Sequence, residues 1–149
     1  MSWVTPMGLP VNQPYRKGGV LSVKTVMQTV QVAHNSDDLQ INVMRQKSAF
    51  PPNFVHSLDS THMLLTAIRM QNEGIPFTAV HDSYWCHAGN VDAMNEALRS
   101  CFVDLYSMSI LEDLKQSLEV RYPNAHFPPV PTRGELNLGD VKQSTYFFN

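Results

Sequence analysis

An acidic residue interrupts an apolar, β-branched segment that otherwise has the composition of a buried strand. The segment reads Phe77-Thr78-Ala79-Val80-His81-Asp82-Ser83-Tyr84-Trp85. Burying a carboxylate is costly unless a cation, a hydrogen-bond donor or a metal compensates it. The pattern therefore predicts two strands, over residues 77–80 and 84–88, joined by a tight turn that exposes Asp82.

The residues of this turn cannot form a hydrolase triad, although they are of the right types. In an extended chain neighbouring side chains point to opposite faces, so Asp82 faces away from His81 and Ser83. An exposed carboxylate can instead hold a hard cation such as Mg²⁺. Two-metal phosphoryl transfer needs further acids from separate segments. On the tripeptide alone an ordinary turn is the simpler interpretation, because Asp favours turns.

The composition is that of one globular domain with few charges. The 149 residues are 43% hydrophobic, which is enough for a core, but only 16% are charged, against about a quarter in typical proteins. A partner, a nucleic acid or the rest of a longer polypeptide could cover part of the surface, but composition alone slightly favours ordinary variation. The net charge of −2 argues against a free-standing nucleic-acid binder but leaves room for a local basic patch.

The two cysteines, Cys86 and Cys101, are too few for a disulfide framework and indicate a reducing compartment. No basic start precedes an apolar run at the N-terminus, so we expect no signal peptide. No stretch is apolar for long enough to cross a bilayer, and we expect no membrane partner. The chain begins in the middle of a predicted strand, which suggests a piece of a longer protein.

Residues 1–48 are predicted to be a β-rich segment followed by a loop. Residues 3–5 and 10–13 are typical of a hairpin with a Pro- and Gly-containing turn. Residues 20–32 alternate and are rich in β-branched side chains, as in a strand. Residues 34–48 are polar without a clear period and are predicted to be a loop.

Residues 49–122 are predicted to hold a helix, the hairpin that carries Asp82, and further helices. The first helix is expected over 53–73, with Pro51 and Pro52 at its entry, Asn53 as N-cap and Gly74 just after its end. Amphipathic patterns predict two more helices, over 91–106 and 110–120.

Residues 123–149 are predicted to be a Pro-rich loop, over 123–131, and a C-terminal tail. The tail ends in Tyr146-Phe147-Phe148, whereas most termini are polar and frayed. Phe147 and Phe148 therefore either dock into a core or approach a functional site, and docking is the better interpretation. Taken together, residues 1–149 are predicted to form a single unit of the α+β class.

A second group of polar residues lies on the first predicted helix. His56, Asp59 and His62 are spaced i, i+3, i+6 and fall within about a third of the helix circumference. This resembles a two-histidine, one-carboxylate metal site, which would suit a metal hydrolase. A polar helix face is the better interpretation, because the spacing spreads the three side chains along the helix. The carboxylate of Asp59 also favours the positive helix start.

Two motifs in this order and spacing resemble a known family. Residues 50–62 read Phe-Pro-Pro-Asn-Phe-Val-His-Ser-Leu-Asp-Ser-Thr-His, and residues 80–85 read Val-His-Asp-Ser-Tyr-Trp. They are similar to the C-terminal part of the single-subunit, phage-type DNA-directed RNA polymerases, and especially to the mitochondrial RNA polymerase of animals. Residues 3–15 and 144–148 match the same family, so the resemblance runs from end to end.

The resemblance implies a fold and an activity. The fold would be the C-terminal palm and fingers-edge portion of a right-hand polymerase, with an antiparallel hairpin that carries the catalytic aspartate packed against helices. The activity would be template-dependent nucleotidyl transfer from nucleoside triphosphates, with Mg²⁺ as cofactor. The partners would be the DNA template and the nascent RNA. The location would be the mitochondrial matrix.

The resemblance also implies roles for individual residues. Asp82 matches the aspartate on the palm hairpin and would be a catalytic and metal-binding residue. His81 would lie near the primer end, and His56 would touch the minor-groove side of the nascent base pair. Ser57 and Ser83 are their neighbours and would lie near the nucleic acid or the substrate.

Several parts of the family pattern are missing from these residues. We find neither a second palm aspartate nor the fingers helix whose lysine and tyrosine grip the triphosphate. We therefore expect the isolated chain to be inactive and to need the missing N-terminal part of the polymerase, with transcription factors as partners of the full-length enzyme. The alternative is a stand-alone, non-catalytic remnant that binds a nucleic acid or a partner.

Overall fold

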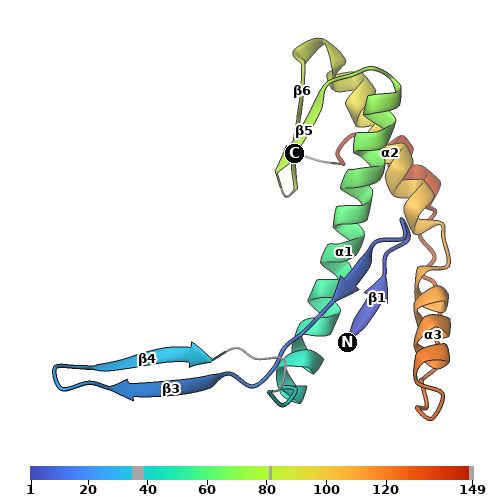
Figure 1. Cartoon of the computed structure of the whole chain (residues 1–149). Helices are drawn as coiled ribbons and strands as arrows, with labels where there is room; N and C mark the ends of the chain where they lie inside the picture. The colour runs from blue at the N-terminus through green and yellow to red at the C-terminus, as the bar shows by residue number, and fades with distance from the viewer. Residues whose placement is uncertain (35–38, 81, 148–149) are drawn as a thin grey trace.

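The computed structural model describes residues 1–34, 39–80 and 82–147. Their elements follow one another in the order shown in Figure 1. They are β1 (Ser2–Val4), β2 (Pro10–Asn12), β3 (Gly19–Lys24), β4 (Thr29–His34), α1 (Val43–Asn72), β5 (Phe77–Val80), β6 (Ser83–Cys86), the short helix η1 (Ala88–Asn90), α2 (Val91–Tyr106), α3 (Ile110–Arg121) and the short helix η2 (Leu138–Lys142).

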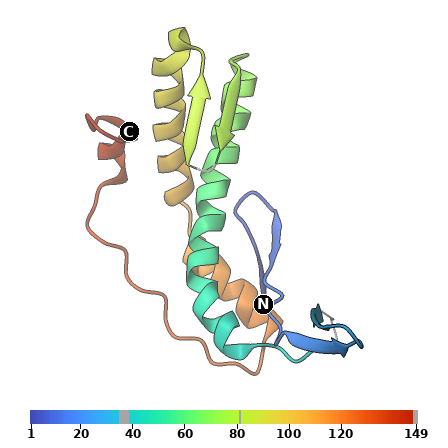
Figure 2. The same ribbon diagram turned by 90° about the vertical axis from the view of Figure 1, so that its left-hand side faces the viewer.

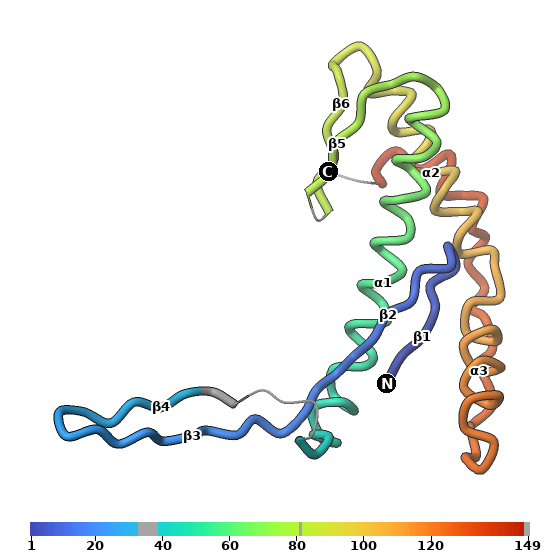
Figure 3. Tube along the Cα trace, viewed as in Figure 1, coloured from blue at the N-terminus to red at the C-terminus, as the bar shows by residue number. Residues whose placement is uncertain are grey.

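The long helix α1 is the element along which most of the others pack. The β1–β2 hairpin lies against its N-terminal half, next to α3, and the β5–β6 hairpin and α2 lie beside its C-terminal half (Figures 1 and 2). The β3–β4 hairpin projects away from this body, as the tube in Figure 3 shows. Each sheet within the described residues is a two-stranded antiparallel hairpin, so the fold is a mixture of helices and small hairpins. This confirms the α+β prediction at that level.

The end of α1 confirms the role predicted for Gly74. Its φ is +71°, in the left-handed region that favours glycine. The Gly74 N–H donates to the Gln71 carbonyl at 3.0 Å, and the Ile75 N–H donates to the Met70 carbonyl at 2.9 Å. These two bonds form a Schellman motif, which satisfies the last carbonyls of the helix.

The start of α1 corrects two predictions. The helix begins at Val43, so the predicted loop over 34–48 is wrong for its last residues. Asn42 is the N-cap, not Asn53, and its side-chain oxygen accepts the Arg45 N–H at 3.0 Å. An N-cap asparagine satisfies one of the free N–H groups of the first turn.

Pro51 and Pro52 lie inside α1 rather than at its entry. A proline in a helix interior removes an N–H donor and usually breaks the helix. Here Phe50 and Phe54, on either side of the two prolines, pack on Trp3 with ring centroids 5.4 and 6.1 Å from it. These tertiary contacts stabilise helical geometry through the prolines.

Residues 20–32 form a hairpin, not the single strand that their alternation indicated. β3 and β4 pair in antiparallel register from Gly19↔His34 to Lys24↔Thr29. The chain reverses where the Thr25 hydroxyl donates to the Gln28 carbonyl at 2.8 Å and accepts the Gln28 N–H at 3.1 Å. The prediction of β structure is confirmed, and the reversal was not predicted.

A small core joins β1 to α1. It consists of Trp3, Phe54 and Leu58, against which half-buried apolar residues of β2, α1, α2 and α3 pack. A second buried row runs along α2 and comprises Ala97, Leu98, Cys101 and Leu105. The predicted helix over 91–106 is confirmed, and the one predicted over 110–120 extends by a single residue.

The C-terminal tail docks on α2. The ring of Phe147 lies edge-on to Phe102 with centroids 5.1 Å apart, which confirms the docking predicted for Phe147, whereas Phe148 lies outside the described residues. Within the part of the chain that the structure describes, no helix has both the length and the apolar character needed to span a bilayer.

Candidate functional site

An open hollow of about 690 Å³ lies between α1 and the β5–β6 hairpin. Its walls combine polar and apolar side chains from these two parts of the fold, which are contributed by His56, Asp59, Ser60, His62, Met63, Asp82 and Tyr84. The hollow therefore brings together residues from both motifs singled out in the sequence.

Asp82 occupies the turn of the β5–β6 hairpin, as predicted. Val80 pairs with Ser83 across the hairpin, which places Asp82 in the turn between the two strands. Asp82 is exposed, and its carboxylate is available to a ligand in the hollow. His81 lies outside the described residues, and Ser83 is exposed at the first position of β6.

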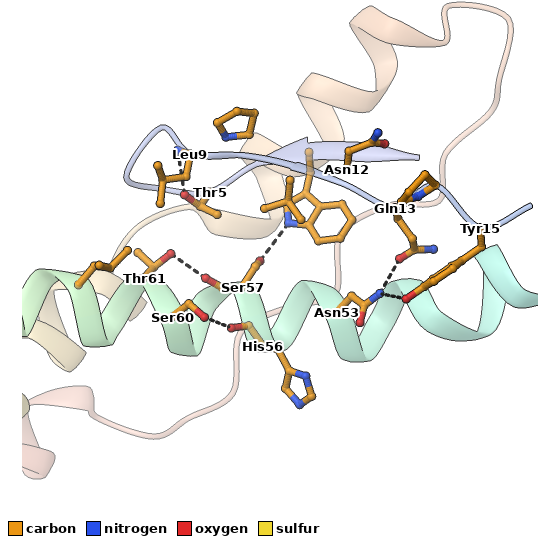
Figure 4. A pocket seen from close by; sticks show the side chains of 15 residues that line it. Thr5, Leu9, Asn12, Gln13, Tyr15, Asn53, His56, Ser57, Ser60 and Thr61 are labelled. Atoms are coloured by element: carbon orange, nitrogen blue, oxygen red, sulfur yellow. Dashed lines mark hydrogen bonds between the residues drawn. The ribbon is translucent and has the colours of Figure 1, made fainter. Parts of the chain in front are cut away.

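α1 presents a polar row to the hollow. The polar row consists of His56, Asp59 and Ser60, and the apolar Met63 lines the hollow beside it. Spacings of three and four residues place all four on one helical face. In Figure 4 the His56 ring points away from the β1–β2 hairpin, on the opposite side of α1. His56 is thus directed outward, where a ligand can reach it.

Ser57, by contrast, faces the β1–β2 hairpin. Its hydroxyl accepts a hydrogen bond from Trp3 Nε1 at 3.0 Å (Figure 4). The same hydroxyl donates to the Phe54 carbonyl at 2.6 Å. Ser57 is only 9% exposed. Its two hydrogen bonds serve the packing of the hairpin on α1, a role that the sequence did not indicate because Trp3 is distant in the chain.

A second hollow, of about 490 Å³, lies under the β1–β2 hairpin. His56 and Ser60 line both hollows, so the two open on the same stretch of α1. The second hollow is largely apolar on the side of β1 and β2, where Leu9, Pro10 and Val11 contribute to its wall.

His62 is buried rather than available as a ligand. It is 4% exposed, and its Nε2 lies 2.8 Å from the carbonyl oxygen of Leu98 on α2. A carbonyl can only accept, so Nε2 carries the hydrogen and donates it. Burial lowers the pKa of His62, and the Leu98 bond and the negative charge of Asp59 oppose that shift. The imidazole therefore favours its neutral form.

The metal-hydrolase interpretation of His56, Asp59 and His62 is wrong. His62 is directed to Leu98 of α2, whereas His56 points outward. Within residues 1–34, 39–80 and 82–147, no group of three or more His, Cys, Asp or Glu side chains could hold a metal ion. The three residues form a polar helix face, the alternative that the spacing favoured.

Two carboxylates give the hollow a negative character. Burial raises the pKa of Tyr84, and the charges of Asp59 and Asp82 raise it further. Burial also raises the pKa of Tyr106, and the charge of Asp59 adds to that shift. None of the described residues that line the hollow is a lysine or an arginine. The arrangement suits a cation or a hydrogen-bond donor.

Comparison with known proteins supports the family resemblance that the two motifs indicate. The family model for DNA-dependent RNA polymerase matches residues 1–127. The chain is 51% identical over 147 residues to DNA-directed RNA polymerase 1A of Nicotiana tabacum. The matching segment covers 99% of this chain and 94% of that relative. It is 52% identical over 147 residues to the chloroplastic/mitochondrial DNA-directed RNA polymerase 2 of Arabidopsis thaliana. Here the matching segment covers 99% of this chain but only 14% of the relative.

The relatives differ greatly in length. A mitochondrial DNA-directed RNA polymerase 1 of Nicotiana sylvestris is 51% identical, and the chain again spans 14% of it. The chain thus corresponds to nearly all of one relative and to a small part of others. These relatives are from plants, so the special similarity to the animal mitochondrial enzyme stays a prediction.

Proposed function

The chain belongs to the DNA-dependent RNA polymerase family, and on that premise we propose that it forms the C-terminal part of the catalytic core of an organellar DNA-directed RNA polymerase. In this proposal it contributes the palm hairpin and the adjoining helix to template-dependent nucleotidyl transfer. The other catalytic groups come from polypeptide that corresponds to the remainder of the long relatives.

The observation that carries the proposal is the shared hollow of His56 and Asp82. The two residues are far apart in sequence and come from α1 and from the β5–β6 turn, yet they line one cavity. A carboxylate at an exposed turn and an outward-facing imidazole are suited to a ligand that has both a cation-bound phosphate and hydrogen-bonding edges. A primer terminus paired with its template, together with a nucleoside triphosphate, is such a ligand.

The proposal gives each residue the role that the family resemblance implies. Asp82 is the catalytic carboxylate, and His56 contacts the minor-groove side of the nascent pair. His81 and Ser83 flank Asp82 and lie near the primer end. Ser57 is close in sequence to His56 but is buried against Trp3, so its part in the proposal is to hold α1 in place.

Mg²⁺ is the cofactor that this chemistry implies, and the residues present fit it in part. Asp82 supplies the hard oxygen ligand that Mg²⁺ prefers, in a hollow where Asp59 adds a second negative charge. Bound Mg²⁺ would neutralise charge on the transferring phosphoryl group. The described residues offer no complete ligand set, which is why the proposal needs carboxylates from other polypeptide.

The location and the partners are inferred from the relatives. The Arabidopsis relative is named as chloroplastic/mitochondrial and the Nicotiana sylvestris relative as mitochondrial. We propose an organellar location for this protein, with the mitochondrial matrix as the specific form of it. The partners would be the DNA template, the nascent RNA, nucleoside triphosphates and the transcription factors of the complete enzyme.

The test uses a long relative as a host. In the Arabidopsis relative, the segment that matches over 147 residues is replaced by this chain, and primer extension and DNA binding are measured with and without Asp82→Asn. We expect the chimera to extend a primer, and Asp82→Asn to abolish extension while template binding is unchanged. Asp92→Asn, at the exposed start of α2, is the matched control. Near-normal extension by the Asp82→Asn chimera would contradict the proposal.

A second function is favoured by one comparison. The tobacco relative of which this chain covers 94% is itself short, as a stand-alone non-catalytic binding protein would be. In that case the purified chain would bind a template–primer duplex or a protein partner, and Asp82→Asn would change neither this binding nor the activity of any chimera.

A further inference from the structure

Arg99 of α2 fastens the C-terminal segment to the body of the protein. Its Nη1 donates to the carbonyl oxygens of Val141, at 2.7 Å, and Ser144, at 2.6 Å. Its guanidinium carbon lies 5.5 Å from the centroid of the Phe147 ring. One side chain therefore contacts the segment at three points, two through charge-assisted hydrogen bonds and one through a cation–π contact.

Phe102 connects this anchored segment to α1. Its ring lies edge-on to Phe147, with centroids 5.1 Å apart, and edge-on to His62, with centroids 5.7 Å apart. Both pairs have the T-shaped geometry that favours aromatic contacts. Phe147, Phe102 and His62 thus form a continuous path of ring contacts, which we call the aromatic path.

The aromatic path ends at the candidate site. His62 belongs to the wall of the hollow that also holds His56 and Asp82, and its Nε2–H bond to Leu98 fixes the ring to α2. Figure 2 shows α2 between η2 and α1, as the path requires. A shift of the segment bound to Arg99 would therefore be transmitted to the helix that carries His56.

We propose that Arg99 is a positioning residue for the polymerase site: by anchoring residues 141–147 it holds Phe102 against His62, and so holds the polar row of α1 in register with the Asp82 turn. The inference rests on the proposed function, because it takes the hollow as the catalytic surface. Arg99 touches neither that hollow nor the reacting groups, and it acts through Phe102 and His62. A small misplacement of such a surface is enough to slow a reaction.

The first test uses the 149-residue chain itself and does not depend on polymerase activity. The imidazole ¹⁵N–¹H signals of His62 and tryptic cleavage after Lys142 are measured for wild type and Arg99→Gln at one pH. We expect the His62 signals to shift and cleavage to accelerate. Arg133→Gln is the matched control, since Arg133 also binds a backbone carbonyl, that of Met108 at 2.7 Å. It should leave the His62 signals in place.

Unchanged His62 signals in Arg99→Gln, with faster cleavage after Lys142, would overturn the inference, because release of the segment would then have no effect on the site. If Arg99→Gln does not fold, Phe147→Leu interrupts the aromatic path while Arg99 remains. The same shift of His62 is expected, and its absence would overturn the inference equally.

The second test separates positioning from stability, in the chimeric polymerase described above. Arg99→Gln should lower kcat on the order of tenfold with little change in KM for nucleoside triphosphates. Arg99→Lys, which keeps the charge and donors, should recover part of kcat. An unchanged kcat would overturn the inference even if His62 shifts. Failure of the proposed function is recognised separately, by normal extension with Asp82→Asn.

Discussion

The indole nitrogen of Trp3 donates a 3.0 Å hydrogen bond to the hydroxyl of Ser57, 54 positions away in the chain. Trp3 is 2% exposed and Ser57 is 9% exposed, so neither polar group has ready access to water. The bond fixes the β1–β2 hairpin to the face of α1 opposite His56. It therefore links the N-terminal motif of the chain to the helix that bears the candidate site.

Ser57→Ala should destabilise the protein by about 1–3 kcal/mol, because the buried Trp3 N–H then has no acceptor. Urea unfolding of the 149-residue chain, followed by far-UV circular dichroism, measures the loss. Ser60→Ala is the control: Ser60 is exposed and donates only to the His56 carbonyl of its own helix. It should change stability by no more than about 0.5 kcal/mol. Equal losses from the two substitutions would show that the Trp3 bond contributes nothing.

Gly74→Ala should destabilise the protein by about 1–2 kcal/mol, the cost of a left-handed conformation for an L-residue with a side chain. An added Cβ at Gly74 meets no atom within 4 Å, so the whole effect comes from its φ of +71°. Gly89→Ala is the matched control, because that Cβ also meets open space and its φ is not left-handed. Equal urea midpoints for Gly74→Ala and Gly89→Ala would contradict this account of the C-cap.

Local signals were sufficient to predict the hairpin and the two later helices. Polar residues between two short apolar runs predict the turn that carries Asp82, and β5 has the predicted bounds. β6 covers Ser83–Cys86 rather than the predicted 84–88, because Ala88 already belongs to η1. The amphipathic pattern over 91–106 gives the observed bounds of α2. Such elements could be predicted because neighbours in the sequence determine them, through period, turn chemistry and a helix-stopping glycine.

The start of α1 could not be predicted in this way. Two consecutive prolines are a strong local signal for a helix boundary, and here contacts with Trp3 outweigh it. The same limit applies to the site. Spacing alone places His62 with His56 and Asp59, whereas its position is determined by Leu98 on another helix. The roles of Ser57 and His62 depend on partners that no local pattern reveals.

Burial of His62 should make stability depend on pH. Its pKa in the folded protein is lowered from the ordinary value of 6.5 by burial, so below that value the unfolded chain binds the proton more readily than the folded one. Stability is then complete above about pH 6.5 and falls as the pH decreases through 6.5 towards the folded-state pKa.

The measurement is the free energy of unfolding in urea at pH 7.5 and at pH 5.5. The wild type should lose more stability between these pH values than His62→Gln, which has no proton to bind. His56→Gln is the control, because His56 is exposed, and its loss should match that of the wild type. The same pH-dependence in wild type and His62→Gln would exclude His62 as the source.

The 149-residue chain by itself is expected not to extend a primer. Two-metal phosphoryl transfer needs carboxylates that hold ions about 3.5–4 Å apart. In the proposed function Asp82 is one such carboxylate, and the described residues contain no group of three or more His, Cys, Asp or Glu side chains that could hold a metal ion. The check is a primer-extension assay with Mg²⁺ and all four nucleoside triphosphates, with the chimeric polymerase as positive control. Template-dependent product from the purified chain, lost on Asp82→Asn, would show that this chain holds the ions without carboxylates from elsewhere.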